Sequence, residues 1–192
     1  SPDPRAIIEP AQFKASKSLR KLARQQRHTV TMNYAFAEVI QQCASIARKS
    51  PGSNRISHDT WITQEMLLAY QRLHDAGMAH SVEVWDDHNK LVGGLYGVAV
   101  GAVFCGESMF HIAPNTSKLA IYALVKHMLR NELAFIDCQL PTEHLSSLGA
   151  STLRRTEFIS RLSQHNTMLD NNGSISPRYR QHWQKQVIKI GR

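Results

Sequence analysis

Residues 92–110 read VGGLYGVAVGAVFCGESMF, and this stretch decides the predicted fold. Its apolar residues, interrupted by Gly101, are typical of two strands that meet at a tight turn. The glycines indicate that a ligand or a neighbouring chain segment lies close to the strand backbone. One carboxylate, Glu107, stands near the end of the second strand. A core hairpin with a solvated acid is the alternative interpretation of the pattern.

The segments around this hairpin alternate between helical and extended patterns. Asn33 is the expected cap of an early helix, and Thr63 and Gly77 are expected to begin and end the next one. Residues 1–11 and 49–59 look like a lead-in and a polar loop. Helices are predicted at 16–27, 34–48, 63–76, from 117, at 142–148 and at 153–163, and strands at 79–86, 90–100, 102–107, 133–139 and 186–190. This order predicts an α+β (α/β) fold with a mixed sheet rather than a doubly wound parallel one.

Composition excludes several classes of protein. The 192 residues are 42% apolar and 20% charged, as expected for a domain with a substantial core. No apolar run approaches about 18 residues, so no membrane span is expected. Three widely separated cysteines indicate a reducing compartment, and the absence of paired Cys or His spacings argues against a zinc site.

Positive charge gathers at the two ends of the chain, which carries a net charge of +8. The N-terminal run contains no acid and consists of Lys14, Lys17, Arg20, Lys21, Arg24 and Arg27. The tail after Asp170 is also basic and without acids. Two such runs indicate an extended anionic partner, with nucleic acid as the first candidate. Solvated helix faces are the alternative explanation.

Several motifs occur together in one order. They are TWI with Trp61, AHSVEVW at 79–85, VGGLYGV at 92–98, FCGESMF at 104–110, SK at 117–118, IDCQ at 136–139 and SLGA at 147–150, together with SPDPR at 1–5 and VTMNYAF at 30–36. With these motifs, residues 1–162 resemble the leucyl/phenylalanyl-tRNA–protein transferase family.

The resemblance implies a fold like the GNAT acyltransferases, with a mostly antiparallel mixed sheet and helices on its faces. It implies transfer of Leu or Phe from Leu-tRNA or Phe-tRNA to the α-amine of proteins that begin with Arg or Lys. The product carries an N-terminal degradation signal. The resemblance further implies a cytoplasmic monomer without a cofactor or a membrane partner.

Two residues of the IDCQ motif are the catalytic candidates that the resemblance implies. Asp137 and Gln139 stand two apart on a predicted strand, so both side chains should leave the same face. An amide is a very weak base, so Gln139 is expected to position the reacting groups and Asp137 to orient them. The ester donor is already activated, so positioning and oxyanion stabilisation supply most of the rate. A structural hydrogen-bond pair is the alternative role.

The resemblance also implies substrate contacts. Glu107 is expected to select a cationic N-terminal side chain, and Trp61 and Tyr70 to contact the terminal adenosine. Core packing is the alternative role of Tyr70. The pocket for the Leu or Phe side chain and its surroundings are expected from Leu95, Phe104, Gly106, Ser108 and Met109. The basic run from Lys14 to Arg27 is expected to follow tRNA phosphates.

The chain also departs from the family pattern. Residues 1–11 are interpreted as a lead-in left from a missing small N-terminal domain, 12–192 as the catalytic domain, and 165–192 as a divergent tail. A truncated, non-catalytic tRNA-binding domain is therefore the main alternative function. A GNAT-type N-acyltransferase with a thioester donor is disfavoured, because residues 111–117 contain no glycine for a pyrophosphate loop.

Overall fold

The computed structural model describes residues 2–45, 48–49, 56–57, 62–165 and 181–190. Its centre is an eight-stranded sheet in the order β10-β2-β5-β6-β7-β8-β1-β9. Neighbouring strands are antiparallel except for the parallel pair β7–β8. The strands are β1 (Arg5–Ile8), β2 (Thr29–Met32), β5 (Ala79–Trp85), β6 (Leu91–Val100), β7 (Val103–His111), β8 (Phe135–Gln139), β9 (Ser151–Leu153) and β10 (Gln186–Val187). The mixed, mostly antiparallel α+β architecture predicted from the sequence is thus confirmed.

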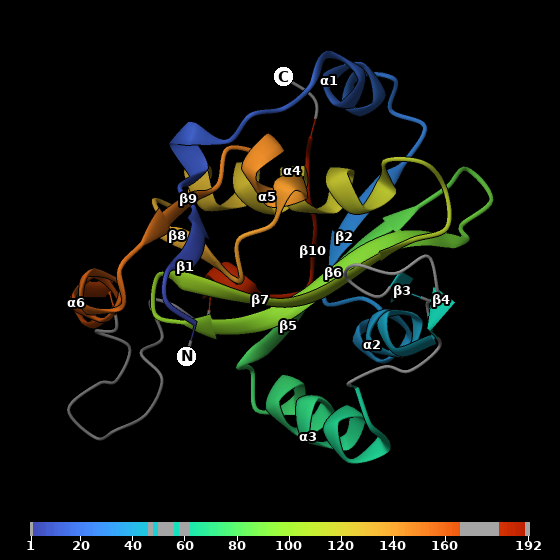
Figure 1. Ribbon diagram of the computed structural model, residues 1–192. Coiled ribbons are helices and arrows are strands. Elements are labelled where there is room, and N and C mark those ends of the chain that lie inside the picture. The colour runs from blue at the N-terminus through green and yellow to red at the C-terminus, as the bar shows by residue number, and fades with distance from the viewer. Residues whose placement is uncertain (1, 46–47, 50–55, 58–61, 166–180, 191–192) are drawn as a thin grey trace.

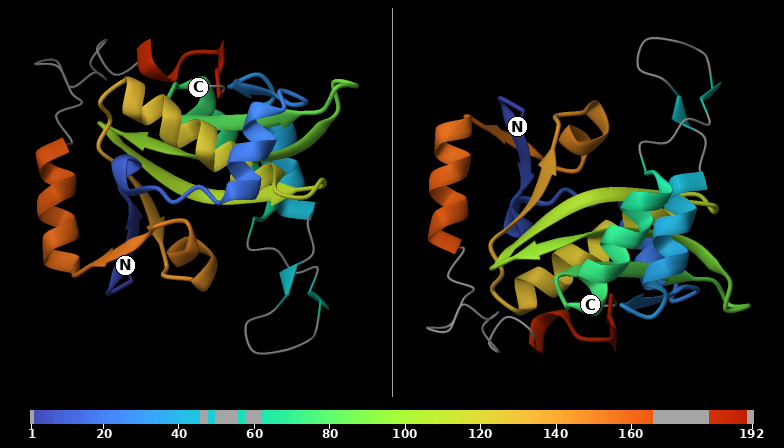
Figure 2. Two further views of the ribbon diagram at one scale, coloured as in Figure 1. Left: turned by 90° about the horizontal axis from the view of Figure 1, so that it is seen from above. Right: turned by 90° about the horizontal axis from the view of Figure 1, so that it is seen from below.

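Helices cover both faces of the sheet. They are α1 (Lys17–Arg24), α2 (Phe36–Ser45), α3 (Gln64–Asp75), α4 (Thr116–Arg130), α5 (Glu143–Ser147) and α6 (Arg155–His165), with 3₁₀ turns η1 (Pro10–Gln12) and η2 (Gln181–Trp183). Helix α4 lies along one face with α1 and α5, whereas α2 and α3 lie under the other (Figures 1 and 2). Helix α6 packs beside the outer strands. No helix in the described ranges is both long and apolar enough to cross a membrane.

Two apolar clusters hold these layers together. On the α4 face, Phe104 of β7 packs with Ile121 and Leu124, which stand three residues apart on one face of α4. On the α2 face, Tyr96 and Phe110 pack with Phe36 and other residues of α2 and α3. Burial of side chains of this size contributes about 1.5–3 kcal/mol each. The sheet is therefore fixed between helices on both sides, which makes it a rigid base for a site.

The central hairpin is present, but its glycines serve the chain itself. Gly101 turns the chain with φ +65°, as expected of a tight turn. A Cβ at Gly94 would lie 2.8 Å from the Val82 carbonyl oxygen, and one at Gly97 would overlap the Cys105 carbonyl. Gly106 differs, because the atom nearest to a Cβ there would be the Asp137 carbonyl oxygen, 3.6 Å away. Of the two predicted causes of close approach, a ligand or a neighbouring chain segment, the second is found at Gly94 and Gly97, where adjacent strand backbone lies close.

Other differences concern short elements. Residues 5–8 were expected in a lead-in, yet they form β1 between β8 and β9. The predicted loop at 49–59 contributes to a two-stranded pair, β3 (Arg48–Lys49) with β4 (Ile56–Ser57). Strand β7 extends four residues beyond the predicted end. These pairings join segments that no local pattern connects, so sequence periodicity does not reveal them.

Asn33 is not the cap that the sequence suggested. Its backbone is left-handed, and its side chain accepts the Ser81 N–H at 3.0 Å while donating to the Trp183 carbonyl. Ser16 and Thr63 do cap their helices, accepting from Leu19 and Met66 respectively. Asn33 instead fastens the C-terminal segment to the sheet.

That segment carries Trp183 into a buried site beneath α4, here called the Trp183 socket. The indole ring stacks on His80 and Phe104 at 5.2 and 5.3 Å between ring centroids, and His127 lies 5.5 Å away. Burial lowers the pKa of His80 to about 3 and that of His127 to about 4. Strand β10 then pairs with β2, so the expectation of a final edge strand is confirmed.

Candidate functional site

Strands β7 and β8 part in the middle of the sheet. They pair in parallel from Val103–Phe135 to Cys105–Asp137, and the recorded pairing ends there. Just beyond this point β7 has a bulge, because Gly97 pairs with Gly106 but Tyr96 pairs with Ser108. The extra residue is Glu107. A bulge re-aims a side chain out of the regular alternation, and here it brings a carboxylate to the place where the strands separate.

Strand β8 has a matching irregularity. Ile7 of β1 pairs with Asp137, and Ala6 pairs with Gln139, so Cys138 is the extra residue. Gln139 ends the strand in the left-handed conformation with φ +64°. This backbone turns the amide side chain toward β7. The opening between β7 and β8 is thus lined by residues from two opposed bulges.

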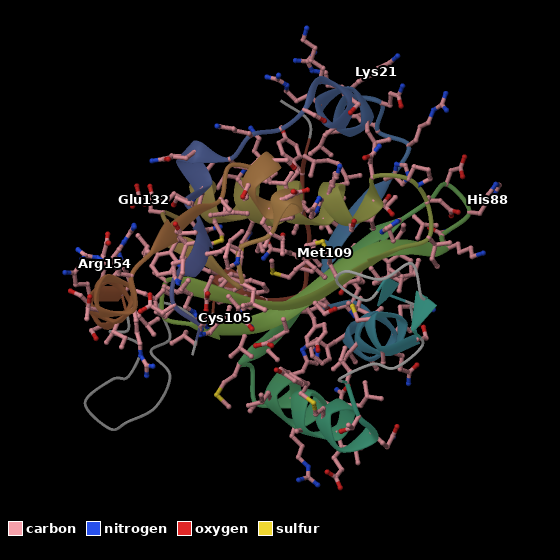
Figure 3. All side chains as sticks on the ribbon, viewed as in Figure 1. Lys21, His88, Cys105, Met109, Glu132 and Arg154 are labelled. Atoms are coloured by element: carbon pink, nitrogen blue, oxygen red, sulfur yellow. The ribbon has the colours of Figure 1, made fainter. Side chains whose placement is uncertain are left out.

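An apolar cavity of about 270 Å³ lies in this opening. Its walls come from β6, β7, α4, β8 and α5, and Figure 3 shows Met109 near the middle of the molecule. The lining residues are Leu95, Tyr96, Phe104, Gly106, Glu107, Ser108, Met109, Ile121, Leu124, Ile136, Cys138 and Leu145. All five residues predicted around the Leu or Phe pocket are among them. Their binding role stays a prediction.

The polar edge of the opening is a connected network. Gln139 Nε2 lies 3.3 Å from the Gly106 carbonyl oxygen and 3.3 Å from Glu107 Oε2. The Gln139 backbone N–H donates to Asp137 Oδ1 at 3.0 Å. Arg5 donates to both Asp137 oxygens, from Nε at 2.9 Å and from Nη2 at 2.6 Å. Four residues from β1, β7 and β8 are therefore joined by direct contacts, one of which uses the Gln139 backbone.

The geometry differs from the expectation that Asp137 and Gln139 leave one face together. The bulge at Cys138 breaks the two-residue alternation on which that expectation rests. Asp137 faces Arg5 on β1, whereas the Gln139 side chain reaches toward β7. The two residues are linked through the Gln139 backbone instead. Their catalytic roles stay predictions.

Burial and charge shift the pKa values of several groups here. Burial raises the pKa of Tyr70, and the neighbouring Glu107 carboxylate raises it further. Burial raises the pKa of Cys105 to about 12, with Asp137 and Glu107 adding to the effect. The hydrogen bond to Asp137 raises the pKa of Arg5 against the opposing effect of burial. At neutral pH the phenol and thiol therefore stay protonated and Arg5 stays charged.

The remaining predicted contacts have separate outcomes. Trp61 lies outside the described residues. Tyr70 sits on α3 with its ring edge-on to Tyr96 at 5.2 Å, so it has a packing role beside Glu107. The basic run forms an open hollow on α1 lined by Lys17, Arg20, Lys21, Arg24 and Gln25. Lys14 and Arg27 flank the helix, and Lys21 points away from the molecule in Figure 3.

Sequence reasoning missed several residues of the site. Arg5 is the most consequential, because its partner Asp137 is 132 positions away. Ile121 and Leu124 also line the cavity, and they belong to the apolar face by which α4 packs on the sheet. The motif SPDPR, which contains Arg5, was the single available signal, and it carried no indication of the partner.

Comparisons with known proteins agree with this picture. The family model described as leucyl/phenylalanyl-tRNA protein transferase matches residues 7–163. Curated proteins with that name include one from Psychrobacter arcticus, 46% identical over 192 residues, covering 99% of this chain and 68% of the relative. Another, from Psychrobacter cryohalolentis, is 48% identical over 171 residues, covering 84% and 61%. A third, from Pseudoalteromonas atlantica, is 53% identical over 164 residues, covering 85% and 67%.

Solved structures give weaker similarity. L-PGS from Bacillus licheniformis matches with a TM-score of 0.45 and 10% identity, over 96% of this chain and 58% of that one. A conserved protein of unknown function from Staphylococcus epidermidis matches with a TM-score of 0.46 and 9% identity, over 79% and 57%.

The family match and the sequence identities show that this α+β protein is an aminoacyltransferase. More specifically, it belongs to the leucyl/phenylalanyl-tRNA–protein transferase family. The chain spans about 61 to 68% of the length of the three curated relatives named above.

Proposed function

We propose that this chain transfers leucine or phenylalanine from aminoacyl-tRNA to the α-amine of proteins that begin with Arg or Lys. The observation that carries the proposal is the apolar cavity of about 270 Å³ beside Gln139 and Glu107, in a chain of this family. The cavity accepts the side chain of the amino acid. The polar edge receives the ester and the incoming amine.

The reaction needs no external energy source, because the donor is an ester. The amine nitrogen attacks the ester carbonyl, the new C–N bond forms, and the C–O bond to the tRNA ribose breaks. The proton leaves the amine and ends on the ribose oxygen. An unperturbed α-amine has a pKa of about 7.7–8.0, so a useful fraction is neutral near physiological pH. Alignment of amine and ester is then the main requirement.

Gln139 and Asp137 supply that alignment in the proposal. The Gln139 amide lies where β7 and β8 part, with its NH₂ group near the Gly106 carbonyl. It exchanges this long contact for one to the reacting groups. Asp137 holds the Gln139 backbone and acts through it, so Asp137 is not the group that abstracts a proton.

Glu107 selects the acceptor. Its carboxylate is half-buried beside Tyr70 and Gln139, so a guanidinium or ammonium group placed there gains a charge-assisted contact. The apolar lining selects the donor by size, and each methylene changes discrimination by about 1–3 kcal/mol. Amino acids unbranched at Cβ share the cavity, whereas β-branched Ile and Val meet its wall.

The tRNA contacts extend beyond the cavity. Helix α1 offers exposed cations with no acid in the run, which suits the phosphates of an acceptor stem. Trp61 and Tyr70 are proposed to contact the terminal adenosine, Trp61 by stacking and Tyr70 through its hydroxyl group.

We further propose a GNAT-like arrangement, supported by the parting of parallel strands β7 and β8 beside the site. The protein works in the cytoplasm as a monomer, and its product carries a degradation signal. The small number and wide spacing of the three cysteines, at positions 43, 105 and 138, support a reducing compartment.

The test is transfer of labelled Leu from Leu-tRNA to a peptide that begins with Arg. The wild-type chain, Gln139→Ala and Glu107→Gln are compared, with Gln164→Ala as the matched control on exposed α6. We expect Gln139→Ala to lose transfer while tRNA binding is kept, and Glu107→Gln to lose at least tenfold of the preference for Arg over a neutral first residue.

Each outcome separates the alternatives. Binding of tRNA without transfer by the wild-type chain would identify a non-catalytic tRNA-binding domain. Transfer from an acyl-CoA alone would contradict both the aminoacyltransferase and the tRNA-binding domain. Full activity of Gln139→Ala would move the reaction away from the opening between β7 and β8.

A further inference from the structure

Arg5 occupies a position that is unusual for a surface arginine. Its guanidinium forms a two-point pair with Asp137, at 2.9 Å from Nε and 2.6 Å from Nη2. The Asp137 side chain is only 1% exposed, and that of Arg5 is 16% exposed. A paired fork of this kind fixes the orientation of the carboxylate as well as its charge.

The arginine is itself fixed from two sides. Its backbone belongs to β1, which lies between β8 and β9 in the sheet. Its guanidinium lies 4.6 Å from the centroid of the Phe158 ring of α6. The hydrogen bond to Asp137 raises the pKa of Arg5, so the group stays charged at all physiological pH values. Strand, ring and carboxylate together leave the arginine one orientation.

The Asp137 carboxylate, held in place by Arg5, in turn holds the backbone of Gln139. Asp137 Oδ1, which accepts from Arg5 Nε, also accepts the Gln139 backbone N–H at 3.0 Å. Gln139 has φ +64°, a conformation that residues with a Cβ rarely adopt. Such a backbone persists only where its surroundings hold it. Gln139 Nε2 then lies 3.3 Å from both the Gly106 carbonyl oxygen and Glu107 Oε2.

We propose that Arg5 is a positioning residue for aminoacyl transfer, acting through Asp137 to hold Gln139 at the opening between β7 and β8. The inference rests on the proposed function, because the transfer reaction is what Gln139 serves. Without Arg5, Asp137 keeps a buried negative charge with no cation beside it, which is unfavourable unless the carboxylate moves or gains a proton. Either change releases the Gln139 backbone, and small displacements of positioning groups reduce rates by about 100-fold.

The test compares Arg5→Gln, Arg5→Lys and Arg5→Ala with Arg161→Gln. Arg161 is a matched control, because it pairs with Glu9 at 2.8 Å and lies 5.2 Å from the Phe135 ring centroid without contacting Asp137. We expect Arg5→Gln to lower kcat about 10- to 100-fold with KM for Leu-tRNA unchanged, and Arg5→Lys to fall between it and the wild type. Arg161→Gln should stay within twofold of the wild type.

Guanidinium at millimolar concentration gives a second measurement. It should restore part of the activity of Arg5→Ala, because the truncated side chain leaves room for the ion, and it should not restore Gln139→Ala. Sodium chloride at equal ionic strength is the control. A loss of activity caused by unfolding alone would not respond to guanidinium at this concentration.

Amide hydrogen exchange of Gln139 tests the positioning without any activity. In Arg5→Gln the exchange of this N–H should be at least tenfold faster than in the wild type, with the amides of α4 unchanged. Faster exchange in Arg5→Gln, combined with a wild-type chain that transfers no amino acid, would support the positioning role and overturn the proposed function. Unchanged exchange, an unchanged kcat, or equal losses in Arg5→Gln and Arg161→Gln would each overturn the role of Arg5.

Discussion

Phe104 lies between two regions of the molecule, the apolar cavity and the Trp183 socket, and the two differ in what occupies them. One side of its ring lines the cavity between β7 and β8, and the ring also stacks on Trp183 in the Trp183 socket. The socket is filled by the chain's own indole, and its imidazoles have lowered pKa values that keep them neutral. The cavity has a volume of about 270 Å³, and the charged pair of Arg5 and Asp137 lies near its edge.

The difference shows how polar groups mark a site. In the socket, polar atoms serve to attach a segment, as when Asn33 donates to the Trp183 carbonyl. At the cavity, Gln139 and Glu107 face each other at 3.3 Å, a distance at the weak end of hydrogen bonding. Weakly held groups beside an apolar cavity can exchange partners, whereas the socket residues cannot do so without unfolding the segment.

Replacing the carboxylate of Asp137, at the edge of the cavity, should have the largest effect of the changes considered. Asp137→Asn cannot accept both Arg5 contacts, because one amide position is a donor facing a donor. We expect kcat for Leu transfer to fall about 100- to 1000-fold, the usual cost of losing a key preorganised group. Steady-state kinetics with Leu-tRNA and an Arg peptide measure this, and exposed Asp87→Asn is the control. A fall of less than tenfold would contradict the comparison.

A substitution at the wall between the two regions should have the next largest effect. In Gly97→Ala the new methyl group overlaps the Cys105 carbonyl and lies 2.6 Å from Phe104 Cε1. We expect a loss of about 3 kcal/mol in the free energy of unfolding, the upper end for overpacking. Urea denaturation measures it.

Gly106→Ala is the matched control for this change. Its added Cβ meets its nearest neighbour, the Asp137 carbonyl oxygen, at 3.6 Å, so the free energy of unfolding should stay within about 0.5 kcal/mol of the wild type. Equal destabilisation by the two substitutions would show that the wall does not depend on close contact at Gly97.

Lowering the pH should reduce the free energy of unfolding through the Trp183 socket, with a smaller effect than the substitution at Gly97. The pKa of His80 is lowered from 6.5 to about 3, mainly by burial, so at pH 5 the unfolded chain binds a proton that the folded chain does not. The stabilisation is complete above about pH 6.5 and is lost as the pH falls toward 3. From pH 7 to pH 5 this histidine should remove about 2 kcal/mol of stability.

The measurement is urea denaturation at both pH values for the wild type and His80→Gln. The variant should lose about 2 kcal/mol less over the interval. Glu83, whose pKa burial raises, contributes equally to both proteins and cancels. His88→Gln, with a side chain 87% exposed, is the control and should match the wild type. Identical pH dependence of the wild type and His80→Gln would remove His80 from the explanation.

A change on α1 lies outside both regions and should have the smallest effect. Lys21→Gln removes one exposed cation from the basic hollow. The slope of log affinity for tRNA against log salt should decrease by about 1, with kcat unchanged. Fluorescence anisotropy over a salt series measures the slope. An unchanged slope would show that this face does not contact phosphate.

The sequence predicted the elements that have strong local patterns. The hairpin predicted at 90–107, α3 with its Thr63 cap, and the helix predicted from residue 117 all occur, although β7 runs four residues further than predicted. Strand β1 was missed because its residues follow a proline-rich start and pair only with distant strands. Pairing partners are set by tertiary packing, which local periodicity does not encode.

Within the site, too, residues in local motifs were predicted, whereas contacts between distant segments were not. Residues within the motifs of the hairpin, such as Leu95 and Met109, were predicted together and lie together. Arg5 was not predicted, because nothing local connects it with Asp137. The two bulges also could not be predicted, since each is visible only in the register between two strands.

The return of the C-terminal segment to β2 has a consequence for the order of folding. The hydrogen bond from Asn33 to Trp183 joins residues 150 positions apart, so on the ribosome it forms only after nearly all of the described chain has been synthesised. Until then the edge of β2 is unpaired and the Phe104 ring lacks its indole cover, which is a condition that favours association with other nascent chains. Such a distant closure is also slow to form. The pairing of β10 with β2 is therefore the last step that completes the edge of the described sheet.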